Sequence, residues 1–416
     1  MKYILIILVI VITLGFLQID EDKSSTAKEW TTKLENDRAS KSEAFIYLNG
    51  IMAAENEDVM EVGENRFSAY KKAEEVTEPY DDEIVFDDYP NDKMLPKPHE
   101  DNEIYCKLWE SDCLGIIIKN SSKWESELND HSVILARYRK FISFSEFTTL
   151  SRPSAIEVIP SYKYIGYGNK LALLESLFLA ERGSPRDAMA SLSGDVNKLR
   201  KQLAVADNLI HKMVFVNLIA NNLDVIAYIG NKYESYQKLN ISYLTLDELS
   251  IAEPMIREFG MMNDLYTSLD GNPEIFEIGG NMPSWFVRAV FKPNMTINES
   301  IFLYERLIYM ATLSQDVFPT LKLPDAEEMK KEINYLNYVG SVLNSIAFPN
   351  YHEYVARLYD LNCKISLVRY VLSDKKTPLE NPYYPNSKSY EASETEICFN
   401  GPYDDTRRLR CISTKV

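Results

Sequence analysis

The chain has 416 residues, of which 45% are hydrophobic and 26% charged, a balance that argues against global disorder and against a multi-span membrane protein. Its length allows one large domain or about two to three ordinary ones. The formal net charge of −17 repels phosphate backbones, and no basic arm or stripe opposes it, so nucleic-acid binding is disfavoured.

An apolar run near the N-terminus predicts a transmembrane anchor within residues 1–22. Residues 3–19 are interrupted only by Thr13, Gly15 and Gln18, and a charged cluster follows at 20–23. As a helix, the run reaches roughly 25 Å, which is the short end of what crosses a bilayer core.

A cleaved signal peptide is the alternative, because it also begins with a positive charge and an apolar stretch. Cleavage needs small residues just after that stretch, whereas Phe16–Ile19 are all large, and the small residues Ser25–Ala27 lie beyond the charged cluster. The pattern therefore favours an uncleaved anchor. Lys2 is the only positive side chain before the run, and it predicts a cytoplasmic N-terminus with the rest of the chain exported.

Residues 23–76 predict an N-terminal helical segment, with helices over 26–55 and 62–75. From residue 77 the composition shifts to Asp, Glu and Pro, which bury little surface and favour turns. We therefore expect 77–118 to form an exposed acidic linker that ends in a disulfide loop.

The five cysteines form two local pairs and one left over. Cys106 and Cys113 bracket a short loop, and Cys398 and Cys411 bracket a longer one that is rich in turn residues. In an exported protein this pattern predicts the disulfides Cys106–Cys113 and Cys398–Cys411, with Cys363 unpaired on the secondary face of a helix. Five reduced thiols in a cytosolic protein are the alternative, and no spacing typical of a zinc site is present.

Residues 119–375 predict a helical domain. Four candidate capping boxes mark helix starts: Ser122 with Glu125, Thr245 with Glu248, Thr296 with Glu299, and Asp325 with Glu328. Apolar residues also recur three and four positions apart from Met189 to Met213, which is typical of a coiled-coil seam or of a helix in a globular bundle. We favour the bundle.

Two neighbouring patterns support a bundle. A helix over 170–182 and the turn Gly183-Ser184-Pro185 predict a helical hairpin with the striped helix. The apolar segment Met213–Ile229 is a candidate second span, but its Asn and Asp residues would lie in hydrocarbon, so a buried helix is the better interpretation.

Residues 270–295 predict a long irregular connection, and such connections are often functional. Trp285 and Phe286 within it are candidates for a binding surface. The alternative is that the two rings simply pack the loop onto the core.

Two further helices are predicted over 325–346 and 351–372, each with a periodic apolar face. The segment 376–416 is then expected to be irregular, with a β-hairpin over 397–412. The predicted fold class is mostly α, with an N-terminal transmembrane helix, an irregular multi-helix bundle and a small C-terminal hairpin.

The sequence contains no recognisable reaction motif. His352-Glu353 does not begin a zinc-protease motif, because Ala356 occupies the position of the second histidine. Choosing two carboxylates as a glycosidase pair requires a separation that sequence does not provide. We therefore assign no catalytic residue, cofactor site or metal site.

Two stretches, Leu171–Ile229 with its core Asp207-Asn-Leu-Ile-His-Lys-Met213 and Glu43–Ala69 with Phe45-Ile-Tyr-Leu-Asn-Gly50, resemble uncharacterised single-span envelope proteins of Gram-negative bacteria. The tail Asn381–Tyr390 is similar to an Asp-Pro-Phe-x-Gly-x-Pro-x-x-Tyr ending of related exported proteins, with Asn381 in place of the Asp. The resemblance implies a single-pass protein of the inner membrane with most of the chain in the periplasm, and it implies no activity.

Two functions remain as hypotheses. The first is a non-enzymatic, membrane-tethered protein that binds or scaffolds a partner in the cell envelope. The second is an envelope hydrolase that acts on glycan or peptide, which needs carboxylates or a Ser/His arrangement in one cleft.

Overall fold

A computed structural model describes residues 3, 15, 18–78, 81–99, 101–110, 112–234, 241–271, 284–321, 333–348, 350–373, 378–385 and 387–414. The fold is mostly helical, as expected. The α-helices are α2 (Ser25–Arg38), α3 (Glu43–Gly50), α4 (Val59–Glu74), α5 (Cys113–Lys119), α6 (Trp124–Asp130), α7 (Ser132–Phe141), α8 (Lys163–Glu181), α9 (Pro185–Val205), α10 (Leu209–Lys232), α11 (Leu246–Leu249), α12 (Ala252–Gly271), α13 (Ser284–Val290), α14 (Pro293–Met310), α16 (Tyr338–Ala347) and α17 (His352–Leu372). Short 3-10 turns are η1 (Asn91–Lys93), η2 (Glu103–Tyr105), η3 (Ser121–Lys123), η5 (Phe318–Thr320) and η6 (Tyr335–Asn337).

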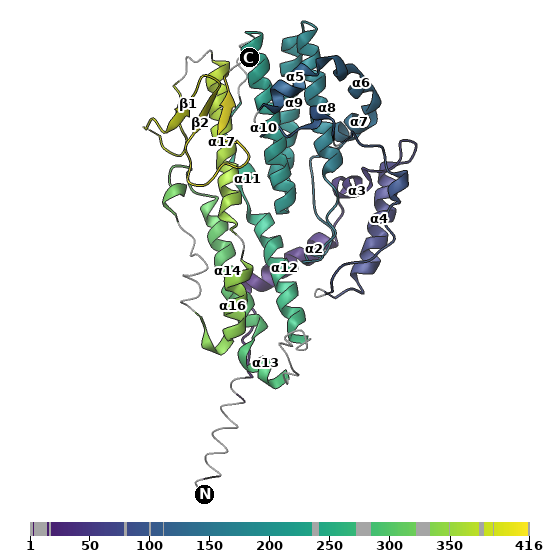
Figure 1. The fold of residues 1–416 in the computed structure, drawn as a ribbon. Coiled ribbons are helices and arrows are strands. Elements are labelled where there is room, and N and C mark those ends of the chain that lie inside the picture. The colour runs from purple at the N-terminus through teal and green to yellow at the C-terminus, as the bar shows by residue number, and fades with distance from the viewer. Residues whose placement is uncertain are drawn as a thin grey trace.

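A small antiparallel sheet lies near the C-terminus, at the opposite end of the molecule from α13 (Figure 1). Its strands are β1 (Tyr390–Ala392), β2 (Glu396–Phe399) and β3 (Cys411–Ser413), in the order β1-β2-β3. Strands β2 and β3 are the predicted hairpin, in register with Cys398 opposite Cys411. The sequence analysis missed the third strand, β1.

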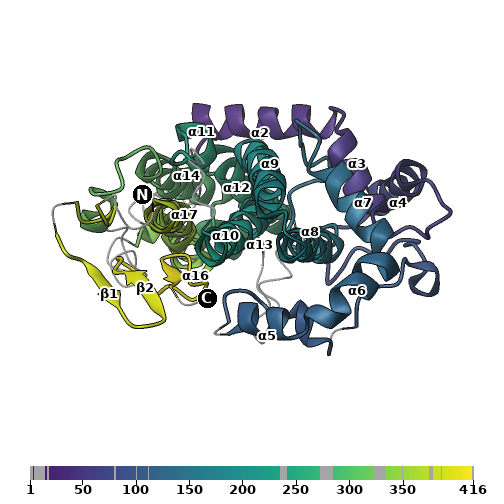
Figure 2. The same cartoon turned by 90° about the horizontal axis from the view of Figure 1, so that it is seen from above.

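Helix α10 lies at the centre of the bundle, between α17 and α8 (Figure 2). Its buried residues face every direction rather than one stripe, because α8, α9, α12 and α17 all pack against it. Among the described residues, α10 alone is long and apolar enough to cross a membrane, by length and composition only, and 67% of its apolar window is buried. The prediction of a buried helix here is confirmed.

The predicted hairpin of α8 and α9 is present. Gly183 adopts a positive φ of 89° between the two helices, and Pro185 occupies the first turn of α9. The apolar pattern from Met189 to Met213 does not belong to a single helix, so this part of the prediction was wrong. Helix α9 ends at Val205, and Asn208 then caps α10 by accepting a hydrogen bond from the amide of His211, so that Ile210 is 45% exposed.

The N-terminal segment consists of α2, α3 and α4. The single helix predicted over 26–55 is interrupted, because the Ser42 side chain accepts a hydrogen bond from the Phe45 amide and starts α3 as a new helix. Helices α3 and α4 approach closely at two glycines. A Cβ atom added to Gly63 would lie 2.1 Å from the carbonyl oxygen of Ile46, so a side chain has no space there.

The segment 77–118 is not an exposed linker throughout, which corrects that expectation. Ile84, Leu95 and Ile104 are buried, and the hydroxyl of Tyr164 donates a hydrogen bond to the carbonyl of Leu95 at 2.7 Å. The prediction was based on the acidic composition of the whole segment and did not consider these isolated apolar residues. They pack the segment against the helical core. One hydrophobic cluster extends along the chain from Ala27 to Ile412.

Helix starts were predicted with mixed success. The capping box of Thr245 and Glu248 is confirmed at α11, whereas Thr296 lies inside α14, which begins at Pro293. Of the helix predicted over 325–346, residues 322–332 lie outside the described part, and α16 is preceded by η6. The apolar face predicted for this helix includes Leu336 and Ile346, which are 54% and 65% exposed, so these two residues are not part of the core.

The predicted anchor lies almost entirely outside the described residues, so it stays a prediction. Residues 20–24, which follow it, are described and contact the bundle. The Asp20 carboxylate accepts hydrogen bonds from the backbone amides of Asn294 and Met295 at the start of α14.

We predict that Gly63→Ala destabilises the protein by about 1 to 3 kcal/mol, because the new methyl group forces the backbones of α3 and α4 apart. Gly194→Ala is the matched control: it lies inside α9 with nothing within 4 Å of the added Cβ, so the better helix propensity of Ala should raise stability by up to about 1 kcal/mol. Urea unfolding followed by circular dichroism measures both. Equal effects of the two substitutions would contradict the close approach.

Candidate functional site

A cavity of about 210 Å³ lies between the 142–162 loop, the start of α10 and helix α12. Three aromatic rings contribute to its wall, those of Phe45, Phe147 and Tyr162. Exposed Ile159 and Ile210 also line it. The polar part of the wall includes Glu157, Arg257 and Glu258. The loop thus brings apolar and charged groups together over the joint between α9 and α10.

Arg257 is the centre of the polar wall. Its guanidinium is buried, and Nη2 donates hydrogen bonds to Glu157 Oε1 at 2.5 Å and to the carbonyl oxygen of Ser151 at 3.2 Å. Burial opposes its charge, but the neighbouring carboxylates of Glu157, Asp207 and Glu258 raise the pKa of Arg257 above its ordinary value. This side chain therefore stays charged and joins α12 to the loop.

Two further carboxyl groups surround this pair. Asp207, just before α10, accepts hydrogen bonds from the Thr149 amide at 2.5 Å and the Thr149 hydroxyl at 2.7 Å. Glu258 accepts one from the hydroxyl of Tyr351 at 2.7 Å. Burial raises the pKa of both Asp207 and Glu258, and the charge of Arg257 offsets this only in part.

Tyr162 of the cavity wall forms a hydrogen bond with the buried His211. The Tyr162 hydroxyl lies 3.0 Å from His211 Nδ1, and the imidazole stacks on the Phe215 ring with centroids 4.4 Å apart. Burial, with a smaller contribution from the charge of Lys212, lowers the pKa of His211 to about 3. The ring is therefore neutral at physiological pH. Its Nε2 atom is buried and has no hydrogen-bond partner in the described part of the chain.

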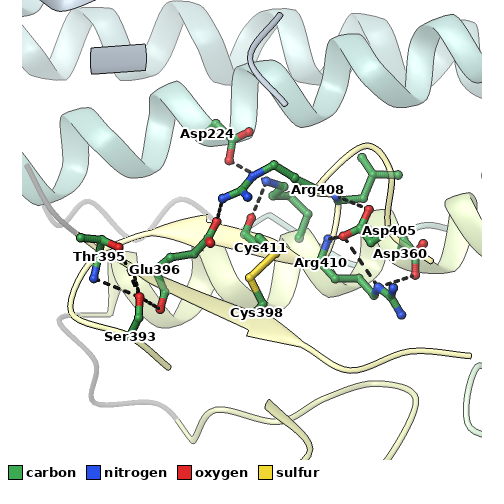
Figure 3. Close-up of a disulfide and its surroundings, with 12 residues drawn as sticks. Asp224, Asp360, Ser393, Thr395, Glu396, Cys398, Asp405, Arg408, Arg410 and Cys411 are labelled. Atoms are coloured by element: carbon green, nitrogen blue, oxygen red, sulfur yellow. Dashed lines mark hydrogen bonds and ion pairs between the residues drawn. A yellow bond between two sulfur atoms is a disulfide. The ribbon is translucent and has the colours of Figure 1, made fainter. Parts of the chain in front are cut away.

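A second charged cluster lies beneath the C-terminal sheet (Figure 3). Lys364 of α17 is buried, and its Nζ atom donates hydrogen bonds to Asp224 of α10 at 2.7 Å and to the Cys411 carbonyl at 2.6 Å. Nearby, Arg410 lies between the carboxylates of Asp360 and Asp405, at 3.5 and 3.7 Å. These contacts join the sheet to two core helices.

Asp360 is the most perturbed acid of this second cluster. Burial raises its pKa to about 7, although the charge of Arg410 and a hydrogen bond from the Tyr383 hydroxyl at 2.8 Å favour the ionised form. Desolvation outweighs the ion pair because the carboxyl group is almost fully buried.

Both predicted disulfides are confirmed. Cys106 pairs with Cys113 across a Cα–Cα distance of 5.8 Å, and Cys398 pairs with Cys411 across 4.0 Å. Cys363 is the free thiol, as predicted. It is fully buried rather than on a secondary face, because α17 is covered on all sides, and Gln315 Nε2 donates a hydrogen bond to its sulfur at 3.3 Å.

Within the described ranges, one group of side chains has the spacing of a metal site, namely Glu396, Cys398 and Cys411. Both sulfur atoms are in the disulfide, so a single carboxylate remains, which is too few ligands for a metal site.

The predicted binding surface does not coincide with the cavity. Trp285 and Phe286 lie on α13 rather than in an irregular loop, and Phe286 is 41% exposed and does not line the cavity. The side chain of Trp285 lies outside the described part. The sequence analysis missed Glu157, Arg257 and Glu258, which line the cavity, and Asp207, which binds the lining residue Thr149, since each is an ordinary charge within its own segment.

Comparison of the chain with protein-family models, with curated proteins and with solved structures gives no match.

We predict that Asp360 makes stability fall as pH rises. The folded protein holds this proton more tightly than the unfolded chain, so its contribution is fully present below the ordinary pKa of 3.8 and is lost as pH rises to about 7. Asp360→Asn does not titrate, so its unfolding free energy should decrease less between pH 4 and 8.

Urea unfolding at several pH values measures this slope. Glu353→Gln removes an exposed carboxylate from the same helix, and it should keep the wild-type slope. A slope unchanged in Asp360→Asn would show that the carboxyl is ionised throughout.

Proposed function

We propose that this protein is a membrane-tethered binding protein of the cell envelope, whose exported helical domain takes a small cationic ligand in the cavity beside Arg257. The observation that carries the proposal is the excess of carboxylates around Arg257: Glu157 and Glu258 line the cavity, and Asp207 binds the lining residue Thr149. One guanidinium interacts with the carboxylates of Glu157, Asp207 and Glu258, and no second cation among the described residues lines the cavity.

The charges favour a cation over an anion. With all four side chains ionised, the group carries a net charge of about −2, and the positive end of α10 offsets only about half a unit. Burial raises the pKa of Asp207 and Glu258 although Arg257 is close, so a further positive charge would favour both ionised forms. An ammonium group in the cavity would stabilise the ionised form of Glu258, which lines it, and at longer range that of Asp207.

The size and the apolar wall of the cavity agree with a small organic cation. At about 210 Å³ the cavity is below the range of about 300 to 1,000 Å³ that holds drug-sized ligands, so a molecule of amino-acid or diamine size fits best. The rings of Phe45, Phe147 and Tyr162 supply aromatic surface, which attracts cations through its π faces.

Export and tethering rest on the sequence and are supported by the cysteines. The two disulfides are typical of an oxidising compartment, which for a single-pass envelope protein is the periplasm. A tethered domain with a ligand pocket is also suited to scaffolding another envelope protein.

Titration calorimetry of the full chain in detergent tests the ligand class. The probes are putrescine and arginine as cations, inorganic phosphate as an anion, and N-acetylglucosamine as a neutral sugar. We expect a cationic probe to bind and Glu258→Gln to weaken binding at least about tenfold, which corresponds to about 1.4 kcal/mol.

Glu253→Gln is the matched control, because Glu253 lies on the same helix but forms an exposed ion pair with Lys33 away from the cavity. It should leave the affinity unchanged. Binding of phosphate alone, or of no cation, would contradict the proposal.

An envelope hydrolase is the second candidate, favoured by one observation: Glu157 and Glu258 line the same cavity, and burial raises the pKa of Glu258, as a general acid requires. Incubation with peptidoglycan distinguishes the two. Release of reducing ends that disappears in both Glu157→Gln and Glu258→Gln would replace the binding proposal.

Tethering is tested by fractionation. We expect the chain to remain in the membrane after alkaline carbonate extraction, with an N-terminus that includes residues 3–19. A mature soluble protein that begins near Lys28 would contradict the tether but would still be consistent with export.

A further inference from the structure

The segment that follows the predicted anchor is fixed to one end of the bundle. Asp20 accepts hydrogen bonds from the amides of Asn294 and Met295 at 2.8 and 3.1 Å, where α14 has no side-chain cap of its own. Asn298 Nδ2 donates to Glu21 Oε1 at 2.6 Å, and Lys23 Nζ donates to Asn263 of α12 at 2.8 Å. Ile19, which ends the apolar run, therefore lies at the start of α14.

The same end of the molecule exposes large apolar side chains. Tyr335 is 87% exposed, Leu336 54% and Tyr338 49%, and we call these three residues the aromatic end. Such side chains normally bury most of their surface, so adjacent exposed ones indicate an interaction site. Helices α13 and α16 form the lower end of the molecule in Figure 1, opposite the sheet.

A short chain of contacts links the aromatic end to Asp20. Lys292, two residues before Asn294, donates hydrogen bonds from Nζ to the Leu336 carbonyl at 2.6 Å and from its amide to Asn337 Oδ1 at 2.9 Å. Asn337 is buried and also donates to Thr296 of α14 at 3.0 Å. The turn η6 is thus held rigidly beside the point where the apolar run ends.

We propose that the aromatic end is a membrane-contacting surface, which inserts Tyr335, Leu336 and Tyr338 into the interface of the bilayer that holds residues 3–19. This inference rests on the proposed membrane tether. Because Asp20 leaves no free linker between Ile19 and α14, a bilayer around the apolar run reaches this end of the domain.

The composition of the surface matches a bilayer interface. Tyrosine rings prefer the headgroup level of a membrane, where the ring is buried and the hydroxyl stays wet. Lys292 does not supply a free positive charge, because it is buried and bound to η6. The proposed contact therefore depends on the apolar side chains of the aromatic end and not on Lys292.

Spin labelling of the full chain in phosphatidylcholine vesicles tests the surface. The native thiols do not interfere, because Cys363 is fully buried and the other four are in disulfides. A nitroxide is attached to Tyr335→Cys or Leu336→Cys, and to the control Leu246→Cys, which is 70% exposed on α11. Relaxation by oxygen, which concentrates in lipid, is compared with relaxation by a water-soluble nickel chelate.

We expect the ratio of oxygen to nickel accessibility to be several-fold higher at 335 and 336 than at 246. A membrane-embedded chain whose labels at 335 and 336 are as accessible to nickel as the label at 246 would overturn this inference and leave the tether intact. Dipolar broadening between labels without a rise in oxygen accessibility would assign the surface to a second copy of the chain. Loss of the protein on carbonate extraction would refute the tether and this inference together.

Discussion

The burial of most of α10 is the constraint on which the rest of the architecture depends. A helix that is buried on most of its surface must find partners for its buried polar side chains inside the protein. Lys212 Nζ does so by donating to the Leu203 carbonyl of α9 at 3.0 Å, and Asp224 by accepting from Lys364 of α17. Each of these contacts also fixes a neighbouring helix, so the polar groups of α10 determine how α9 and α17 pack around it.

Local rules predicted the parts of the fold that local sequence controls. The apolar positions of α17, the α8–α9 hairpin and both disulfides were predicted correctly, because each depends on residues close in the chain. The break between α9 and α10 was missed, since the apolar spacing continues through it. The cue was Asn208, a residue type that favours helix starts.

The candidate site could not be predicted, because its members come from distant segments. Glu157 follows α7, Asp207 precedes α10 and Arg257 lies within α12, and in an acidic chain none of these residues is unusual by itself. They can be recognised as a candidate site only in the folded structure, where three carboxylates lie around one buried guanidinium. Likewise, the sequence predicted a binding surface at the adjacent rings of Trp285 and Phe286. The exposed apolar surface instead belongs to η6 and α16, for which the sequence predicted a core helix.

The contacts of residues 20–24 bear on the choice between an anchor and a cleaved signal peptide. Cleavage after Ala27 would remove Asp20, which binds the first amides of α14, and Ser24, which accepts a hydrogen bond from the Ala27 amide at the start of α2. Loss of a helix cap costs about 0.5 to 2 kcal/mol, so cleavage there would weaken two helices at once. These contacts would therefore be lost in a protein cleaved at that position. Asp20 directly follows the apolar run, so an uncleaved anchor, which stays a prediction, would keep both helix starts as they are in the structure.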